Sequence, residues 1–156
     1  MDTDLNLPDY SFRTTERDGK RFIYDSIRDR YVRLTPEEWV RQHFLQYLIE
    51  ALDAPPGWIA VETPVRVQGQ PQRADIVVHD RTGSPLLLVE CKAPSHPIRQ
   101  EVFDQSARYN TVLGAPFLVV TNGHEHYACA IDFATRTATF LDDLPPYSEL
   151  LAAHQP

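Results

Sequence analysis

The sequence predicts an α/β domain with a mixed sheet flanked by helices. Three runs of strand-like character, at residues 58–67, 74–79 and 86–91, lie between two segments of helical periodicity, at 35–52 and 98–113. Helical and strand patterns that follow one another in this way are typical of an α/β fold. The chain has 156 residues, 42% of them hydrophobic, which suffices for one core but not for two ordinary domains.

In the N-terminal part we expect an irregular lead-in segment over residues 1–20, followed by a small ribbon. Residues 21–34 alternate charged and apolar side chains, so we expect a two-stranded ribbon that packs on the first helix. Thr35 can cap that helix, Pro36 suits its first turn, and Glu38 completes a capping box. Apolar residues then recur at helical spacing and predict one buried face: Val40, Phe44, Tyr47, Leu48, Ala51 and Leu52.

The three strands after the first helix predict an antiparallel meander, because only short turn-forming segments, 68–71 and 80–83, separate them. The third strand is apolar on both faces, as expected for a central strand covered on each side. The domain should span residues 21–145. Its remaining elements are a helix at 98–113 closed by Gly114, strands at 117–121, 126–131 and 137–141, and a polar C-terminal tail at 146–156.

Composition narrows the class of protein. The formal net charge of −7 argues against a broad phosphate-binding surface, so any contact with nucleic acid must be local or shared with a partner. Cys91 and Cys129 are the only cysteines and are expected to be buried thiols. No apolar run reaches the length of a membrane span, and the acidic N-terminus does not resemble a secretory signal. We therefore expect a cytoplasmic protein without a membrane partner.

Three residues predict a metal site. Glu90 and Lys92 project from the same side of a strand, and Asp75 can lie beside Glu90 if the two strands form a hairpin. Glu and Lys are seldom placed at the end of an apolar strand unless they are paired or bind metal. Mg²⁺ or Mn²⁺ between the carboxylates would neutralise charge on a phosphate, and Lys92 would orient or help deprotonate a water. The alternative is an ion pair of Glu90 and Lys92, with Asp75 in a turn.

The order of these residues resembles the signature of the PD-(D/E)XK nucleases. The segment PQRAD ends at Asp75, and LLLVECK ends at Lys92. The upstream stretch TPEEWVRQ, which starts at Thr35, together with this motif is similar to the N-terminal nuclease domain of type I restriction endonuclease R subunits. The resemblance covers about residues 20–145. It implies a restriction-endonuclease-like core with the order αβββαβ.

The resemblance also implies roles for individual residues. Asp75, Glu90 and the backbone carbonyl of Cys91 match the metal ligands, and Lys92 matches the catalytic lysine. Glu38 stands where many members have a helical acidic residue that reaches the metal through water, a role that competes with its place in the capping box.

Two further residues match a motif found after the lysine in related nucleases. Gln105 and Tyr109 have the Gln-x-x-x-Tyr spacing, which puts both on one helical face toward the site. The alternative for Tyr109 is a half-buried core aromatic.

The sequence leaves two functional hypotheses. The first is a Mg²⁺- or Mn²⁺-dependent nuclease that acts on DNA, alone, as a homodimer or with subunits of a restriction system. No Walker motif is present, so ATP-driven restriction by this chain alone is not expected. The second is a catalytically inactive module that keeps the nuclease fold and binds nucleic acid or protein, as the acidic net charge would allow.

Overall fold

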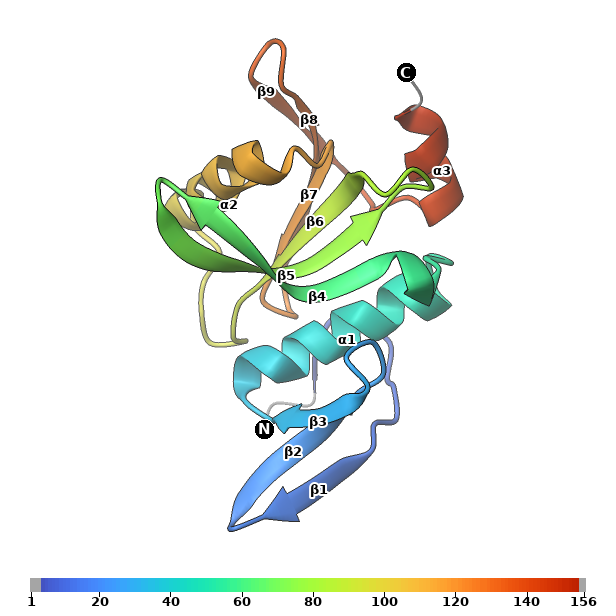
Figure 1. Ribbon diagram of the computed structural model, residues 1–156, viewed down its shortest axis with the longest axis vertical. Helices are drawn as coiled ribbons and strands as arrows, with labels where there is room; N and C mark the ends of the chain where they lie inside the picture. Colours follow the sequence, from blue (N-terminus) through green and yellow to red (C-terminus); the bar gives the residue numbers. More distant parts are fainter. Residues whose placement is uncertain (1–3, 155–156) are drawn as a thin grey trace.

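The computed structural model describes residues 4–154, which form two sheets and three α-helices (Figure 1). The small sheet is antiparallel and contains β1 (Thr14–Arg17), β2 (Lys20–Asp25) and β3 (Arg30–Arg33). The large sheet contains β4 (Ile59–Val67), β5 (Gln70–His79), β6 (Pro85–Cys91), β7 (Phe117–Thr121), β8 (His126–Asp132) and β9 (Thr137–Leu141). The helices are α1 (Pro36–Glu50), α2 (Gln100–Leu113) and α3 (Tyr147–Ala153), and a 3₁₀ turn, Pro56–Trp58, precedes β4.

The large sheet is mixed, as predicted. Its strands lie in chain order from β4 to β9, and β6 and β7 are parallel while every other neighbouring pair is antiparallel. The parallel pair requires a crossover, which α2 provides. From α1 to β7 the elements follow the predicted order αβββαβ. The α/β class and the meander of β4, β5 and β6 are therefore confirmed.

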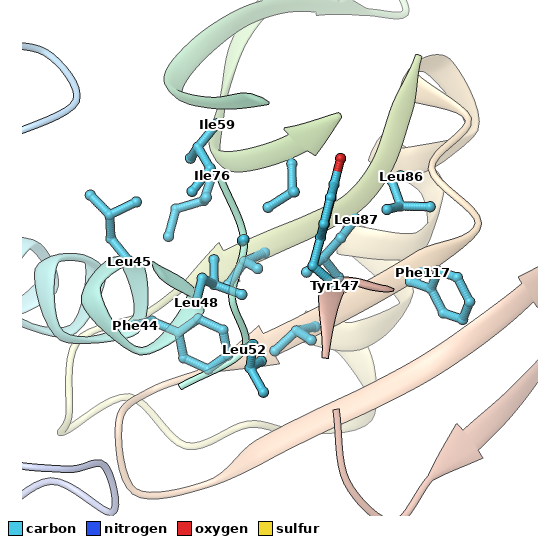
Figure 2. Close-up of a cluster of buried hydrophobic side chains, with 14 of the residues drawn as sticks. Phe44, Leu45, Leu48, Leu52, Ile59, Ile76, Leu86, Leu87, Phe117 and Tyr147 are labelled. Carbon is cyan, nitrogen blue, oxygen red and sulfur yellow. The ribbon is translucent and has the colours of Figure 1, made fainter. Parts of the chain in front are cut away.

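Each face of the large sheet is covered by helix. One core contains residues of α1, α3 and the sheet, and Figure 2 shows Leu48 of α1, Leu87 of β6 and Tyr147 of α3 within it. The second core, on α2, contains Phe103 and Leu118 together with further sheet residues. Cover on both sides explains why β6 and β7 are almost continuously apolar.

Helix α1 begins at its predicted N-cap, whereas the predicted capping-box role of the Glu38 side chain is replaced by contacts with Arg28, Arg41 and Gln42. Thr35 is its N-cap, and its hydroxyl oxygen accepts a hydrogen bond from the Glu38 amide at 3.1 Å. Most of the predicted apolar face is buried; Tyr47 is only partly buried and Ala51 is exposed. Helix α2 ends at Gly114, whose φ of 74° is the left-handed conformation expected of a helix-terminating glycine.

Two predictions of secondary structure were wrong. The ribbon has three strands rather than two, because the polar segment of β1 pairs with β2 through its backbone. The expected polar tail contains α3, whose Tyr147 and Leu150 are buried in the same core as residues of α1 and the large sheet. In addition, β5 starts at Gln70, earlier than expected, because Gln68 and Gly69, both with positive φ, form a tight turn after β4.

Both cysteines are free and buried, as predicted. Among the helices of residues 4–154, none is long and apolar enough to cross a bilayer.

Candidate metal centre

Asp75 and Glu90 face each other on neighbouring antiparallel strands. Ile76 of β5 pairs with Val89 of β6, and the next residues along the two strands are Asp75 and Glu90. Their carboxyl groups are close enough that Asp75 raises the pKa of Glu90. The structure therefore brings the two predicted ligands together, as the hairpin argument required.

Hydrogen bonds from two other elements fix the Asp75 side chain, which is only 6% exposed. The backbone N–H of Cys91 donates to Asp75 Oδ2 at 2.7 Å, and Arg41 Nη2 on α1 donates to Asp75 Oδ1 at 2.7 Å. A buried carboxylate with one donor on each oxygen has little rotational freedom. Its position is therefore set before any ligand arrives.

Glu90 is in a different environment. It is partly buried, and its Oε1 is shielded from solvent without a hydrogen-bond partner within residues 4–154. Burial, and then the neighbouring Asp75 carboxylate, raise the pKa of Glu90 above its ordinary value, while Lys92 acts in the opposite direction. An acceptor that is buried yet unsatisfied is costly, and a metal ion is one partner that would satisfy it.

Lys92 follows directly after β6, two residues beyond Glu90. Its amide donates to the carbonyl of Thr121 at 2.8 Å, which continues the parallel pairing with β7 past the end of the strand. The side chain is partly buried, and its charge partly offsets the rise in the pKa values of Glu37 and Glu90. The ammonium group therefore acts on Glu90, one of the carboxylates that could hold a metal.

The carboxylate oxygens of Asp75 and Glu90 are ligands that a hard cation prefers. Within residues 4–154, no group of three or more His, Cys, Asp or Glu side chains is arranged to hold a metal ion, so the candidate site offers two carboxylates and not a complete set of side-chain ligands. Burial raises the pKa of the Cys91 thiol, so a thiolate ligand is disfavoured there. Mg²⁺, in contrast, is commonly held by one or two carboxylates and several waters. The pair Asp75 and Glu90, with its unsatisfied oxygen, meets that requirement.

Glu38 lies outside this pair. Its carboxylate accepts hydrogen bonds from Arg28 Nη2 at 2.7 Å and Gln42 Nε2 at 2.9 Å, and it also contacts Arg41. These contacts occupy the carboxylate that a capping box would direct to the Thr35 amide. The neighbouring Glu37 is the α1 carboxylate whose pKa is raised by burial and then by Asp75. A water-mediated role for Glu38 stays a prediction.

The residues of the α2 motif lie at different depths. Tyr109 is buried, its hydroxyl has no hydrogen-bond partner within residues 4–154, and burial followed by the charge of Glu90 raises its pKa. Gln105, one turn earlier, is exposed. Both line a hollow of about 180 Å³ together with Val67, Gln68, Gln70, Gln72 and Arg108. Tyr109 thus lines the hollow and is also close enough to Glu90 and Asp75 for their charges to raise its pKa. Gln105 lines the hollow at the protein surface.

Sequence reasoning missed Arg41, Glu37 and Glu62. Besides Asp75, Arg41 Nη2 lies 2.8 Å from Glu62 Oε1 and 3.1 Å from Glu37 Oε1. Glu37 and Arg41 have the i, i+4 spacing of a helical ion pair, so this contact could have been predicted from the sequence. The Glu62 contact could not be predicted from local sequence, because it joins α1 to β4, a separate element.

Comparisons with known proteins place the chain in a family. The family model described as "Type I restriction enzyme R protein N terminus (HSDR_N)" matches residues 36–145. Among solved structures, the chain is similar to a fragment described as an HsdR subunit of a type I restriction enzyme from Vibrio vulnificus YJ016, with 27% identity and a TM-score of 0.57. The similarity covers 76% of this chain and 25% of that one, so the chain spans about a quarter of the relative's length. No curated protein matches the chain.

Proposed function

The chain belongs to the family of the type I restriction enzyme R protein N terminus, and from this membership we propose that it is a metal-dependent nuclease domain with a restriction-endonuclease-like core. Asp75, Glu90 and Lys92 form its active site, and the reaction is hydrolysis of phosphodiester bonds in DNA. The observation that supports this proposal most directly is the pairing of Asp75 and Glu90, with a buried Glu90 oxygen that has no hydrogen-bond partner within residues 4–154.

In this proposal Asp75 and Glu90, with the carbonyl of Cys91, hold Mg²⁺ or Mn²⁺, which supplies charge neutralisation at the scissile phosphate. The amide of Cys91 keeps Asp75 oriented, and the guanidinium of Arg41 donates to the other carboxylate oxygen. Lys92 orients the attacking water and stabilises negative charge on the phosphate. The Tyr109 hydroxyl is buried and has no hydrogen-bond partner among the described residues. It could donate a hydrogen bond to a phosphate oxygen or a bound water.

Metal-dependent cleavage of DNA by the purified chain tests the proposal. Wild type should nick supercoiled plasmid in the presence of Mg²⁺ or Mn²⁺ and not in EDTA. The variant Lys92→Ala should lose about 10²-fold or more of the rate, the range for removal of a positioned catalytic group. Lys20→Ala is the matched control, because Lys20 is exposed on β2 in the separate small sheet. Equal cleavage by wild type and Lys92→Ala would show that the assignment of Lys92 is wrong.

The partners of this activity are part of the proposal. The Vibrio relative is described as a subunit of a type I restriction enzyme and is about four times as long as the matched region. We therefore propose that this domain works in a restriction system, either within a longer R-type polypeptide or beside other subunits. Light scattering of the purified chain would distinguish a monomer from a homodimer that could cut both strands.

A catalytically inactive module is the second candidate. The net charge of −7 opposes tight binding of a polyanion, and Arg41 already contacts Asp75, one of the two carboxylates expected to bind the metal. Calorimetric titration with Mn²⁺ discriminates between the candidates. A folded wild-type protein that neither binds Mn²⁺ nor cuts DNA would favour the inactive module.

A further inference from the structure

Arg41 is a buried cation held among four carboxylates. It is 5% exposed. Its Nη2 atom lies 2.7 Å from Asp75 Oδ1, 2.8 Å from Glu62 Oε1 and 3.1 Å from Glu37 Oε1, and its Nη1 atom contacts Glu38. Two of these carboxylates come from its own helix, and the other two come from β4 and β5. The guanidinium therefore joins α1 to the strands next to the candidate metal site.

The geometry differs from that of an optimised structural ion pair. The Nη2 atom has two hydrogens but three carboxylate oxygens within 3.1 Å, so the three oxygens cannot each have a hydrogen of their own. The Nε–H of Arg41 is buried and has no hydrogen-bond partner within residues 4–154. A planar, bidentate pair would use these donors fully. What the arrangement provides instead is one positive charge at the centre of an acidic pocket.

The positive charge of Arg41 does not neutralise every carboxylate of the pocket. Arg41 contacts Asp75 on one side of the candidate site, whereas Glu90, opposite Asp75, keeps its Oε1 without a partner among the described residues. Asp75 is thus shared between a resident cation and the place where a metal would bind. Two cations that share one carboxylate in a poorly screened environment repel each other.

We propose that Arg41 is a positioning residue that substitutes for metal charge on Asp75 in the metal-free protein and thereby lowers the affinity of the site for a divalent cation. This inference rests on the proposed function in that it takes Asp75 and Glu90 as the metal ligands. The pocket stays folded without metal because Arg41 neutralises it. Metal binding is correspondingly weaker, because the guanidinium remains beside the entering ion.

The test is Mn²⁺ calorimetry on the full chain, comparing wild type, Arg41→Met and Arg41→Lys. Methionine keeps much of the length and apolar stem without the charge, whereas lysine keeps the charge. Arg41→Met should bind Mn²⁺ about tenfold or more tightly than wild type, and Arg41→Lys should stay within about threefold of wild type. Without metal, Arg41→Met should melt at a lower temperature, and its gain in Tm on Mn²⁺ addition should exceed the gain of wild type.

The direction of the change separates this role from a purely structural one. If Arg41 only supported the fold, its loss would loosen Asp75 and weaken Mn²⁺ binding. Weaker or equal binding by folded Arg41→Met, with wild type still binding Mn²⁺, would therefore overturn this inference and leave the proposed function intact. Absence of Mn²⁺ binding in wild type and both variants would overturn the proposed function together with it.

Arg41→Met could fail to fold without metal, and circular dichroism during a Mn²⁺ titration covers that case. Under the proposal, Mn²⁺ should restore the native spectrum of Arg41→Met, because the added ion replaces the missing charge. The double variant Arg41→Met with Asp75→Asn should not recover. Failure of Mn²⁺ to refold Arg41→Met would count against the inference.

Discussion

The backbone amide of Cys91 donates to the Asp75 carboxylate at 2.7 Å, so the strand that contains Glu90 also orients the carboxylate of the neighbouring strand. Cys91 itself faces away from Glu90, and its thiol is buried. The polar half of the site is therefore built on β5 and β6, two neighbouring inner strands of the sheet. Substitutions in this region should act on metal binding and on stability in separable ways.

Glu90 is expected to release a proton when metal binds. Burial and the Asp75 carboxylate raise its pKa, so the folded, metal-free protein retains this proton at pH values where an unfolded glutamate has lost it. The stability that this proton contributes is complete below the unfolded pKa, near 4.5, and is lost as the pH rises through the folded pKa. Mn²⁺ affinity should rise over that same interval. Calorimetry in two buffers of different protonation enthalpy measures the release.

The variant Glu90→Gln provides the control for this prediction. Glutamine mimics the protonated carboxyl, so the free energy of unfolding without metal should stay within about 1 kcal/mol of wild type at neutral pH. Binding of Mn²⁺ should be lost. Metal uptake by wild type with no buffer-dependent heat would contradict the assignment of this proton to the site.

Asp25 should be essential for attachment of the ribbon to α1. It is 0% exposed, and its carboxylate accepts hydrogen bonds from the Ile27 and Arg28 amides, from Arg28 Nε and from Gln42 Nε2, at 2.8 to 2.9 Å. Asp25→Asn places an amide donor against these donors and should cost about 3 kcal/mol of unfolding free energy. Chemical denaturation measures this loss. Asp18→Asn, at an exposed turn position with positive φ that Asn tolerates, should change stability little.

The same residue predicts a pH dependence. Burial opposes ionisation of Asp25, but the hydrogen bonds from Arg28 and Gln42 outweigh it and lower its pKa. The contribution of the ionised carboxylate is therefore present above the unfolded pKa, near 3.8, and is lost as the pH falls through the lower, folded pKa. The difference in stability between wild type and Asp25→Asn should shrink in that acidic range. A difference that stays constant down to pH 2 would refute this explanation.

Gly123 should tolerate alanine less well than Gly83 does. Both have φ near +90°, so backbone strain is similar, but a Cβ at Gly123 would approach Leu5 Cδ2 to 2.7 Å and Val40 Cγ2 to 3.2 Å, whereas a Cβ at Gly83 meets nothing within 4 Å. Gly83→Ala should cost about 1 kcal/mol. Gly123→Ala should cost about 1 kcal/mol more, as measured by thermal unfolding. Adding Leu5→Ala should recover part of the extra loss; equal costs at the two glycines would argue against the packing effect.

Tyr147 should fix α3 to the body of the protein. Its ring is 4% exposed, and its hydroxyl donates to the carbonyl of His79 at 2.8 Å. Tyr147→Phe should cost about 1 kcal/mol through the lost hydrogen bond, and Tyr147→Ala about 3 to 5 kcal/mol through the cavity it leaves. Denaturant titration measures both. Ser148→Ala, on the exposed side of the same helix, should be neutral, and an equally small effect of Tyr147→Ala would mean that α3 does not contribute to the cooperative fold.

The sequence predicted those features that are encoded by neighbouring residues. The start of α1 depends on Thr35 and the amide three residues later, and the meander depends on short turns. The proximity of Asp75 and Glu90 followed from the same local geometry, because strand pairing is extended from a turn by counting residues. The fold class and the placement of the carboxylate pair were therefore accessible without coordinates.

What sequence reasoning missed depends on contacts between distant segments. Arg41 meets Asp75 and Glu62 from two different strands, and no periodicity identifies such partners. Helix α3 has about two turns and follows Pro145 and Pro146, so its pattern is too short to read. Strand β1 is polar and mostly exposed, so its only signal is backbone pairing, which has no signature in composition.

The segment shared with the family and the segment that folds differ in extent. The match ends at residues 36 and 145, yet Asp25 lies beneath Gln42 and Tyr147 lies in the core, both from outside those limits. A protein trimmed to the matched residues 36–145 would lose side chains that pack in its interior and would expose apolar surface to water. The range that matches the family is therefore shorter than the range that folds as a unit. Recombinant versions of the domain should include the longer range.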